Sequence, residues 1–333
     1  MLKSSLPTFS PPLWRKVMRQ NFVDIEKLMD FLQLQAHDRS QVLKNPRFVL
    51  NVPMRLAEKI VKGSLGDPIL RQFLPLINEE SLADDFALDP VGDAPCKISN
   101  KLIHKYEGRV LLIVTSACAM HCRYCFRQFF DYEVQDKSFD EELKIIAGDP
   151  SIHEVILSGG DPLSLDTSAL SLLLKGIEKI PHVKLIRFHT RFPIGIPERI
   201  DDLFLGLLES IHKQIWFVIH SNHPLELDDE VLFALKKVRQ LGIPILNQAV
   251  LLKGINDDLA TQQKLHERLI EGGIIPYYLH QLDKVQGTTH FEVSPLVGMT
   301  LIEELKKQLP GYAVPRYVKE VPGQPGKTEI AGV

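Results

Sequence analysis

The sequence contains few cysteines and no long apolar runs. It has four cysteines in 333 residues, which is too few for a disulfide framework. The longest apolar runs, at residues 110–114 and 215–219, have the length of a strand, whereas a membrane helix needs about 20 apolar residues. The N-terminal stretch lacks the continuous apolar core of a signal peptide. These absences argue against a secreted or membrane protein and predict a cytoplasmic one.

The sequence also lacks an excess of either charge. It has 39 basic and 42 acidic residues, for a net charge of −3 at pH 7. Without a basic excess or a basic tract, no nucleic-acid partner is expected. The 44% hydrophobic content is ordinary for a globular protein, and the length allows one large α/β domain with an accessory segment.

The N-terminal part differs in pattern from the rest of the chain. Residues 1–100 predict a mainly helical segment, in which residues 14–34 carry apolar side chains at helical spacing. A second helix is expected at residues 53–62. Residues 85–97 are rich in Asp, Pro and Gly, which predicts a boundary or a connecting loop.

From residue 101 to residue 300 the pattern changes to strands that alternate with amphipathic helices. Strands are expected at residues 109–115, 154–158, 183–190, 214–220, 243–252 and 275–279. Helices are expected at residues 140–147, 167–178, 200–212, 230–241 and 259–271. This order predicts an α/β fold with a parallel sheet, either an incomplete barrel or an open doubly wound sheet. In both architectures ligands gather at the C-terminal ends of the strands.

Three of the cysteines form a CxxxCxxC motif directly after the first of these strands, at Cys118, Cys122 and Cys125. A [4Fe–4S] cluster usually has four thiolate ligands, so three thiolates leave one iron open to another ligand, as a reactive metal site requires. A zinc site made of the three cysteines and His121 is the alternative. Cys96 stands apart and is interpreted as a structural residue.

The cysteine motif, with Tyr124 before its last cysteine, resembles the signature of the radical S-adenosylmethionine (SAM) superfamily. A second signature of that superfamily, a GGD/E-like turn after the second strand, resembles Gly159, Gly160 and Asp161. The resemblance implies a partial (β/α)6 barrel in which the open iron binds SAM. An electron from the reduced cluster would cleave SAM to a 5′-deoxyadenosyl radical. Because glycine lacks a Cβ, we expect the amides of the turn to approach SAM.

From about residue 10 to residue 330 the sequence resembles the lysine 2,3-aminomutase family. The matching stretches include HKYEGRVLLIVTSACAMHCRYCFR, LSGGDPL, RFHTRFPIGIPERI, HSNHP and NQAVLLKGIND. The C-terminal segment, residues 301–333, contains PGQPGK where the family has PGGGGK. In the family this lysine forms a Schiff base with pyridoxal 5′-phosphate (PLP), so the resemblance assigns Lys327 to PLP. By composition alone the stretch is an ordinary Pro/Gly tail.

The resemblance implies a 1,2-amino shift that converts L-α-lysine to β-lysine while SAM is regenerated. It also assigns further side chains to ligands: His220 and Gln248 to SAM, Arg109 to the PLP phosphate, Arg127 to the substrate carboxylate, and Asp283 and Glu320 to the substrate ε-ammonium. Two carboxylates facing one ammonium favour lysine over a glutamate-type substrate. Glu320 stands where the family usually has Asp, which lengthens its reach by one methylene.

The sequence departs from typical members of the family at its C-terminal end. They carry a longer C-terminal segment with cysteines for a structural zinc, whereas this sequence has no cysteine after Cys125. The short form resembles the branch that supplies (R)-β-lysine for modification of elongation factor P. A reductant protein such as a flavodoxin or ferredoxin is expected, and a homo-oligomer stays open. The alternatives are an aminomutase acting on arginine or glutamate, another radical SAM enzyme in which Lys327 is incidental, or a non-catalytic zinc-binding module.

Overall fold

The computed structural model describes residues 11–81, 83–132 and 138–331. In this part of the chain the central element is a ten-stranded sheet whose strands follow one another in chain order. The strands are β1 (Lys97–Ser99), β2 (Leu102–Tyr106), β3 (Arg109–Thr115), β4 (Glu154–Gly159), β5 (Leu185–Thr190), β6 (Gln214–Ile219), β7 (Ile245–Val250), β8 (Ile275–His280), β9 (Arg316–Lys319) and β10 (Thr328–Glu329). Strands β3 to β9 are parallel to one another, whereas β1, β2 and β10 pair antiparallel with their neighbours.

The six predicted strands are present as β3 to β8, so the parallel α/β barrel segment is confirmed. The sheet then continues, because β9 adds a further parallel strand beside β8. The residues before β2 and after β9 contribute the short antiparallel edges. The C-terminal segment therefore belongs to the same sheet as the barrel strands and carries Lys327 to its edge.

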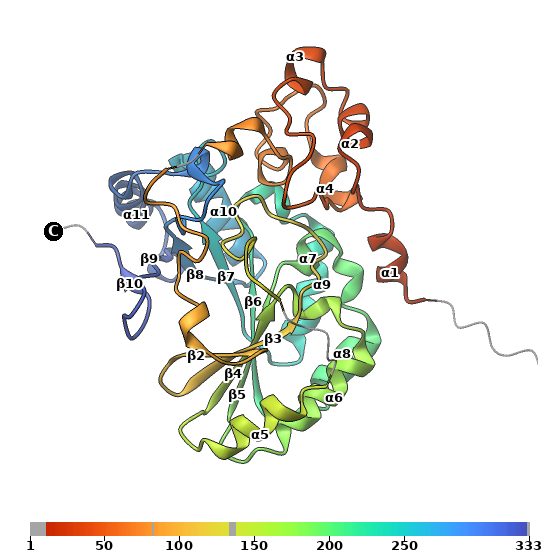
Figure 1. Cartoon of the computed structure of the whole chain (residues 1–333), viewed down its shortest axis with the longest axis vertical. Coiled ribbons are helices and arrows are strands. Elements are labelled where there is room, and N and C mark those ends of the chain that lie inside the picture. Colours follow the sequence, from red (N-terminus) through yellow and green to blue (C-terminus); the bar gives the residue numbers. More distant parts are fainter. Residues whose placement is uncertain (1–10, 82, 133–137, 332–333) are drawn as a thin grey trace, which may run out of the picture.

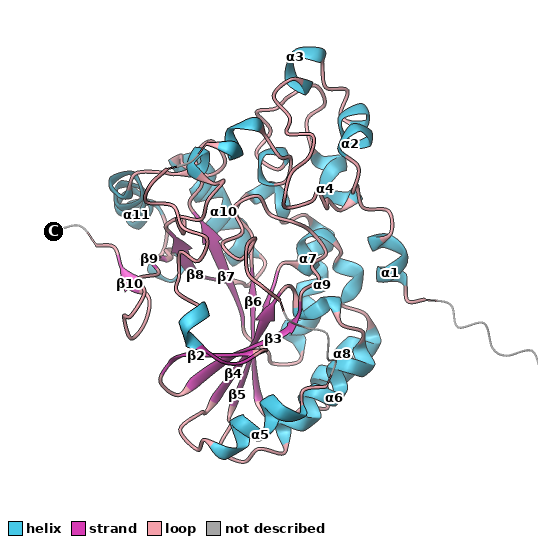
Figure 2. Cartoon of the chain, viewed as in Figure 1, coloured by secondary structure: helices cyan, strands magenta, loops and turns pink. Residues whose placement is uncertain are grey.

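The barrel helices cover the outer face of the parallel strands (Figures 1 and 2). They are α5 (Asp140–Gly148), α6 (Thr167–Glu178), α8 (Asp202–Glu209), α9 (Asp229–Gln240), α10 (Leu259–Glu271) and α11 (Pro295–Gln308). Four of them begin after an aspartate whose carboxylate accepts a hydrogen bond from a backbone N–H of the first turn: Asp166, Asp201, Asp228 and Asp258. Such caps satisfy an otherwise unpaired N–H and fix where each helix starts.

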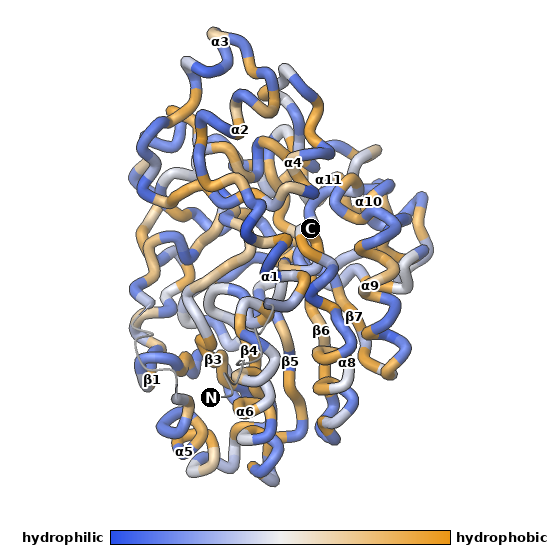
Figure 3. Tube along the Cα trace, turned by 90° about the vertical axis from the view of Figure 1, so that its right-hand side faces the viewer, coloured by the Kyte–Doolittle hydropathy of each residue, from blue (hydrophilic) through white to orange (hydrophobic). Residues whose placement is uncertain are grey.

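Both faces of the parallel strands are largely apolar because helices cover one face and the barrel interior the other. Figure 3 shows the strands β5 and β6 as mostly hydrophobic, whereas the outer helices alternate between hydrophobic and hydrophilic residues. Phe188 on β5 and Phe217 on β6 are fully buried, with ring centroids 5.6 Å apart. The core thus holds the strands, and with them the loops at their C-terminal ends, in fixed positions.

The N-terminal segment is less helical than its apolar spacing indicated. The expected helix at residues 14–34 is wrong as one element: α1 (Leu13–Met18) ends before α2 (Ile25–Phe31) begins. Between them Phe22 forms an antiparallel bridge with Val52, and Asp24 caps α2. Tertiary pairing therefore overrides the helical pattern. The expected helix at residues 53–62 is present as α4 (Met54–Lys59), and residues 1–10 lie outside the described part.

The N-terminal helices lie together at one end of the molecule, beyond the C-terminal ends of the barrel strands (Figure 1). Besides α1, α2 and α4, this N-terminal layer contains α3 (Ala36–Arg39) and several short 3-10 turns. It contacts the cysteine loop directly, since the backbone N–H of His121 donates to the carbonyl of Asn51. Within the described residues, no helix combines the length and apolarity required to span a bilayer.

Candidate active site

A cavity of about 360 Å³ lies against the inner face of the sheet and brings together every residue that the sequence singled out for the site. Its lining includes Arg109, Cys118, Cys122, Cys125, Arg127, Gly159, Gly160, Asp161, His220, Gln248, Asp283, Glu320 and Lys327. They come from six strands, β3, β4 and β6 to β9, or from the loops that follow them. Residues more than two hundred positions apart in the sequence thus share one enclosed space, while the roles given to them stay predictions.

The cysteine loop is held by hydrogen bonds on its outer side. The Asn51 amide donates to the carbonyl of Cys118 at 3.1 Å, and Asn21 donates to the carbonyl of Ala119 at 2.7 Å. Inside the loop the backbone N–H of Cys125 donates to the carbonyl of Cys122. The N-terminal layer therefore fixes the backbone of the loop and leaves the three sulfur atoms to line the cavity.

The three thiols are partly buried and unpaired by disulfides. Burial raises the pKa of the Cys125 thiol to about 11 and that of Cys118 well above its usual value. A free thiolate is therefore unfavourable there, whereas iron would neutralise it. Within the described residues no three His, Cys, Asp or Glu side chains converge on one metal ion. Ligands to three corners of an iron–sulfur cube lie farther apart than ligands to one ion, so the donor set fits a cluster.

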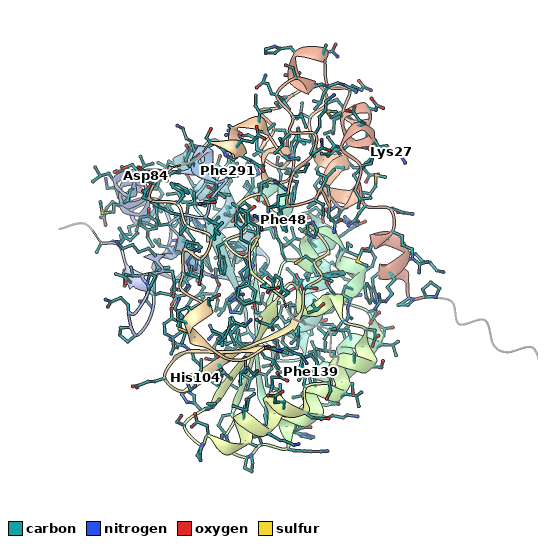
Figure 4. The ribbon with its side chains drawn as sticks, in the orientation of Figure 1. Lys27, Phe48, Asp84, His104, Phe139 and Phe291 are labelled. Carbon is teal, nitrogen blue, oxygen red and sulfur yellow. The ribbon has the colours of Figure 1, made fainter. Side chains whose placement is uncertain are left out.

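His121, the fourth ligand of the zinc alternative, is engaged elsewhere. Its Nδ1 lies 2.8 Å from the carbonyl oxygen of Val49, and its ring stacks on Phe48 with centroids 4.7 Å apart. Figure 4 labels Phe48, which lies where the N-terminal layer meets the barrel. The histidine thus serves the contact between the cysteine loop and the N-terminal layer, and the described geometry favours the cluster over a Cys3His zinc site.

The glycines of the turn after β4 allow its backbone to approach the cysteine loop. A Cβ on Gly160 would lie 2.4 Å from the carbonyl oxygen of Ala117, and Gly159 has a φ of +106°. The amides of Gly160 and Asp161 donate to the carbonyls of Thr115 and Ala117 at 2.7 and 2.8 Å. These two amides are thus used inside the protein, and the contact of the turn with SAM stays a prediction. Glycine is required here because two backbones meet.

Asp161 uses both carboxylate oxygens inside the protein. Oδ1 accepts from the backbone N–H of Leu163 and the hydroxyl of Thr190, and Oδ2 accepts from the backbone N–H groups of Arg191 and Phe192. Burial raises the pKa of Asp161, although these donors oppose that effect. The carboxylate therefore ties the turn after β4 to the loop after β5, and any contact with SAM would come from its neighbours.

Two side chains are predicted to contact SAM: His220, which directly follows β6, and Gln248, which lies within β7. Nε2 of His220 is buried and has no hydrogen-bond partner among the described residues, and burial, helped by the charge of Arg191, lowers its pKa to about 4. Its ring is neutral at pH 7 and packs edge-on against His189 at 5.6 Å. The Gln248 amide lies 2.7 Å from Nε2 of His280. These neutral polar groups suit a ligand bound through hydrogen bonds.

Charged groups gather around Lys327 in another part of the cavity. The Lys327 ammonium forms an ion pair with Glu320, which also pairs with Lys105 at 2.5 Å and accepts from the Tyr106 hydroxyl. Burial alone would raise the pKa of Glu320, but the two lysines outweigh it and lower that pKa. Burial raises the pKa of the neighbouring Asp283 to about 6, while Lys327 opposes the shift. The Lys327 ammonium thus pairs with Glu320 and acts on the pKa of Asp283 from farther away.

The two predicted arginines differ in their partners. Arg109 lies at the start of β3 with its guanidinium 4.7 Å from the Tyr106 ring centroid, and among the described residues it pairs with no carboxylate. Arg127 donates Nε and Nη2 to one oxygen of Asp93, at 3.0 and 2.8 Å, and Nη1 to the Ser158 hydroxyl at 3.4 Å. Arg109 is therefore available to an anion, whereas Arg127 already holds a buried carboxylate that the sequence did not reveal.

Several side chains that line the cavity were not assigned a role from the sequence: Asp93, Lys105, Tyr106, Ser158, Arg187, His189, Arg191, Asn222, Tyr277, Tyr278 and His280. Lys105 and Tyr106 stand in the stretch HKYEGRV, and Arg191 stands in RFHTRFP, so two of the recognised stretches already contained them. Asp93 lies in the stretch interpreted as a boundary loop. In the sequence Asp93 is only an acidic residue shortly before a strand, and no motif or spacing distinguishes it from other acidic residues.

Comparisons with known proteins agree with this arrangement. A family model described as the radical SAM superfamily matches residues 112–261. An L-lysine 2,3-aminomutase of Haemophilus influenzae is 39% identical over 322 residues, covering 96% of this chain and 95% of the relative. An L-lysine 2,3-aminomutase of Escherichia coli K12 is 37% identical over 331 residues, covering 98% of this chain and 96% of the relative. A structure of Streptococcus suis SuiB bound to S-adenosylmethionine matches with a TM-score of 0.48 and 16% identity, over 65% of this chain and 51% of that chain, a likeness too distant to carry an argument.

Proposed function

Because this chain belongs to the lysine 2,3-aminomutase family of radical SAM enzymes, we propose that it moves the α-amino group of L-lysine to the β-carbon and so forms β-lysine. The observation that carries the proposal is the shared cavity, which is lined at once by the cysteine triad, by Lys327 and by the carboxylates of Asp283 and Glu320. An isomerase of this kind needs a radical source, an amine-binding group and a cation site within reach of one substrate molecule.

The radical source would be a [4Fe–4S] cluster on Cys118, Cys122 and Cys125, which, once reduced, supplies the electron that cleaves SAM. The fit rests on three buried sulfur atoms that face the cavity beside an open space. His220 directly follows β6, and Gln248 lies within the neighbouring strand β7. Both offer uncharged polar atoms to that space. The cavity lies between the barrel strands and the cysteine loop that the N-terminal layer holds, and this position limits the access of water to a reactive radical.

PLP would be held by Lys327, with Arg109 at its phosphate, and when bound it supplies a π system that carries the unpaired electron during the amino shift. Arg109 fits the phosphate because its guanidinium pairs with no carboxylate among the described residues and lines the cavity. Lys327 fits because its side chain is 28% exposed while its partner Glu320 is 3% exposed. The lysine is thus partly accessible and can turn from the carboxylate to a ligand in the cavity.

Lysine would be recognised by charge at its two ends. Glu320 already pairs with one ammonium, that of Lys327, whose charge also acts on Asp283, and the ε-ammonium of a substrate lysine has the same chemistry. At the other end Arg127 would hold the substrate carboxylate through Nη1, because Nε and Nη2 donate to Asp93. A glutamate side chain would face two carboxylates and be repelled.

The physiological role is the last part of the proposal. Resemblance to the short branch of the family supports a supply of (R)-β-lysine for elongation factor P. That role requires a low-potential reductant protein such as a flavodoxin or ferredoxin, and a cytoplasmic location. These statements rest on the resemblance in sequence and on the absence of any long apolar helix among the described residues.

An anaerobic assay of the reconstituted protein tests the proposal. Protein, SAM, PLP, a reductant and L-lysine are combined, and β-lysine is quantified by chromatography, with each component omitted in turn. β-Lysine is expected only from the complete mixture. L-arginine and L-glutamate are supplied in parallel, and turnover of either one in preference to lysine would overturn the substrate assignment. SAM cleavage without any amino-acid product would retain the radical chemistry and reject the amino shift.

A further inference from the structure

Arg191, in the loop after β5, is a buried cation that touches the cysteine loop. One of its terminal nitrogens, Nη1, lies 2.7 Å from Sγ of Cys122 and 2.5 Å from the hydroxyl of Tyr124. The other, Nη2, donates to Oε1 of Gln72 at 2.7 Å and to Oε2 of Glu226 at 3.0 Å. The guanidinium is therefore fixed at both ends, with one edge aimed at a sulfur atom.

The groups that hold Arg191 are themselves fully paired. Gln72 donates to Glu226 at 2.9 Å, and the Asn222 amide donates to Gln72 at 3.0 Å and to Tyr124 at 2.6 Å. Gln72, Asn222 and Glu226 have exposed fractions of 2% or less. Nε of Arg191 has no hydrogen-bond partner among the described residues, so its two terminal nitrogens make the side-chain bonds that hold it in this network. The network joins the N-terminal layer, the loop after β5 and the loop after β6 behind one cysteine.

The three cysteines consequently have different surroundings. Cys122 receives a hydrogen bond from the Arg191 guanidinium, and the Tyr124 hydroxyl, which accepts from the same Nη1, acts on the Cys122 sulfur from nearby. Cys125 is contacted by the backbone N–H of Arg127. No donor to the sulfur of Cys118 is found among the residues the structure describes. Only the Cys122 corner thus faces a cation held at hydrogen-bond distance.

We infer that Arg191 is a positioning residue that sets the reduction potential of the cluster through its N–H···S hydrogen bond to Cys122. This inference rests on the cluster assigned under the proposed function, and on no later step. When the cluster takes up one electron from a low-potential reductant and passes from the 2+ to the 1+ state, negative charge on its sulfur ligands increases and no bond is made or broken. A charge-assisted donor stabilises the reduced state more than the oxidised state and raises the potential.

Glu226 gives the inference a test of sign. Its buried carboxylate partly neutralises Arg191 on the side away from Cys122. Substitution Glu226→Gln removes this negative charge while nearly preserving the shape of the side chain, so the cation acts on the cluster with less opposition. Arg191→Gln removes the cation itself. The two substitutions disturb the same network, yet the inference predicts shifts of potential in opposite directions.

The experiment is a redox titration of the reconstituted holoprotein, followed by the electron paramagnetic resonance signal of the reduced cluster, with dithionite and mediators and without lysine. The variants are Arg191→Gln, Glu226→Gln and Tyr124→Phe. Arg199→Gln is the matched control, because Arg199 is equally buried but donates to the carbonyls of Leu163 and Leu165 and to no sulfur. Iron and sulfide content are measured for every variant, and only cluster-loaded protein is compared.

Arg191→Gln is expected to lower the potential, Tyr124→Phe to lower it less, Glu226→Gln to raise it, and Arg199→Gln to leave it unchanged. If Arg191→Gln does not retain a cluster, the inference is tested by Tyr124→Phe and Glu226→Gln, which should shift the potential in opposite directions. The inference is overturned if Arg191→Gln and Glu226→Gln shift the potential in the same direction. Where Arg191→Gln has no cluster, it is overturned if Tyr124→Phe and Glu226→Gln shift the potential in the same direction. A potential of Arg191→Gln equal to that of Arg199→Gln also overturns it. Failure of the proposed function would instead appear as a wild-type protein that carries a reducible cluster and makes no β-lysine.

Discussion

The cavity has two chemically different ends, one around the cysteine loop and one around Lys327. At the cysteine end, backbone amides hold the residues, as the turn at Gly160 and the bonds to Asp161 show, and the ion pair of Arg191 with Glu226 lies in a buried network. At the Lys327 end, ion pairs between side chains hold the residues. The first end is fixed by the fold itself, whereas the second is fixed by charges that can exchange partners.

This difference follows from what each end must do. A cluster must stay bound throughout turnover, so a rigid backbone with its hydrogen bonds already made is suited to hold it. A substrate and a covalently attached cofactor must arrive and leave, so Lys327 needs a partner that another cation can replace. The comparison predicts that damage at the cysteine end removes all chemistry, while damage at the Lys327 end removes only the steps on the amino acid.

The largest effect is expected from Cys125→Ser. Loss of one of three thiolate ligands should abolish cluster binding, because hydroxyl oxygen is a poor ligand for iron–sulfur iron, and both SAM cleavage and β-lysine formation should fall below detection. Iron and sulfide analysis after reconstitution gives the readout. Cys96→Ser is the matched control and should keep full iron content. A cluster retained at full stoichiometry by Cys125→Ser would break the assignment of the cysteine end.

Lys327→Ala should remove β-lysine formation and the PLP absorbance while leaving cluster content unchanged. The physical reason is that the ammonium pairs with Glu320 and makes no contact with the cysteine loop. Reductive cleavage of SAM without substrate should therefore continue at near the wild-type rate. The exposed Lys319 on β9 supplies the control variant Lys319→Ala. If Lys327→Ala also lost its cluster, the two ends could not be regarded as independent.

The sequence predicted the two ends unequally well, and the reason is chain separation. The cysteines form a local motif whose spacing indicated a metal site, and the Gly159–Asp161 turn was recognised by its resemblance to a family signature. The bond from Arg191 to Cys122 spans 69 positions and the ion pair of Arg127 with Asp93 spans 34. No periodicity encodes such pairs, and only the packing of the loops against one another creates them. Lys327 was identified by resemblance to a family, since composition indicated a tail.

For the fold too, the sequence predicted the local elements and missed those that depend on contacts with distant residues. The strands β3 to β8 were predicted because each is a long apolar run between amphipathic helices. The strand β9 spans only Arg316–Lys319 and has charged residues at both ends, so nothing in its sequence separated it from a loop. It forms because β8 offers an unpaired edge. In the N-terminal layer, the pairing of Phe22 with Val52 interrupted a helical pattern that looked continuous.

Asp283→Asn should weaken lysine binding without affecting the cluster. If Asp283 pairs with the substrate ε-ammonium, loss of a buried charge partner costs about 2 kcal/mol or more, so KM for lysine should rise by about 30-fold or more. The kcat value should change less, because the contact is present both before and during reaction. Steady-state kinetics over a range of lysine concentrations measures both. A KM equal to that of the wild type would show that the cation site lies elsewhere and would remove the argument for lysine.

The smallest expected effect is a pH dependence specific to the Lys327 end. Burial raises the pKa of Asp283 from its ordinary value of 3.8 to about 6, so the carboxylate is ionised above that pH and protonated below it. A protonated Asp283 cannot pair with an ammonium, and kcat/KM for lysine should therefore fall as the pH drops below about 6, by up to tenfold per pH unit. Asp283→Asn should abolish this acidic limb and leave a flatter, lower profile. Cluster reduction provides the contrast. Among the described residues Asp283 and Glu320 form no ion pair or hydrogen bond with the cysteine loop, so the yield of reduced cluster should show no matching limb between pH 5 and 7. A limb shared by both measurements would mean that one titration governs both ends, and that the cavity works as a single electrostatic unit.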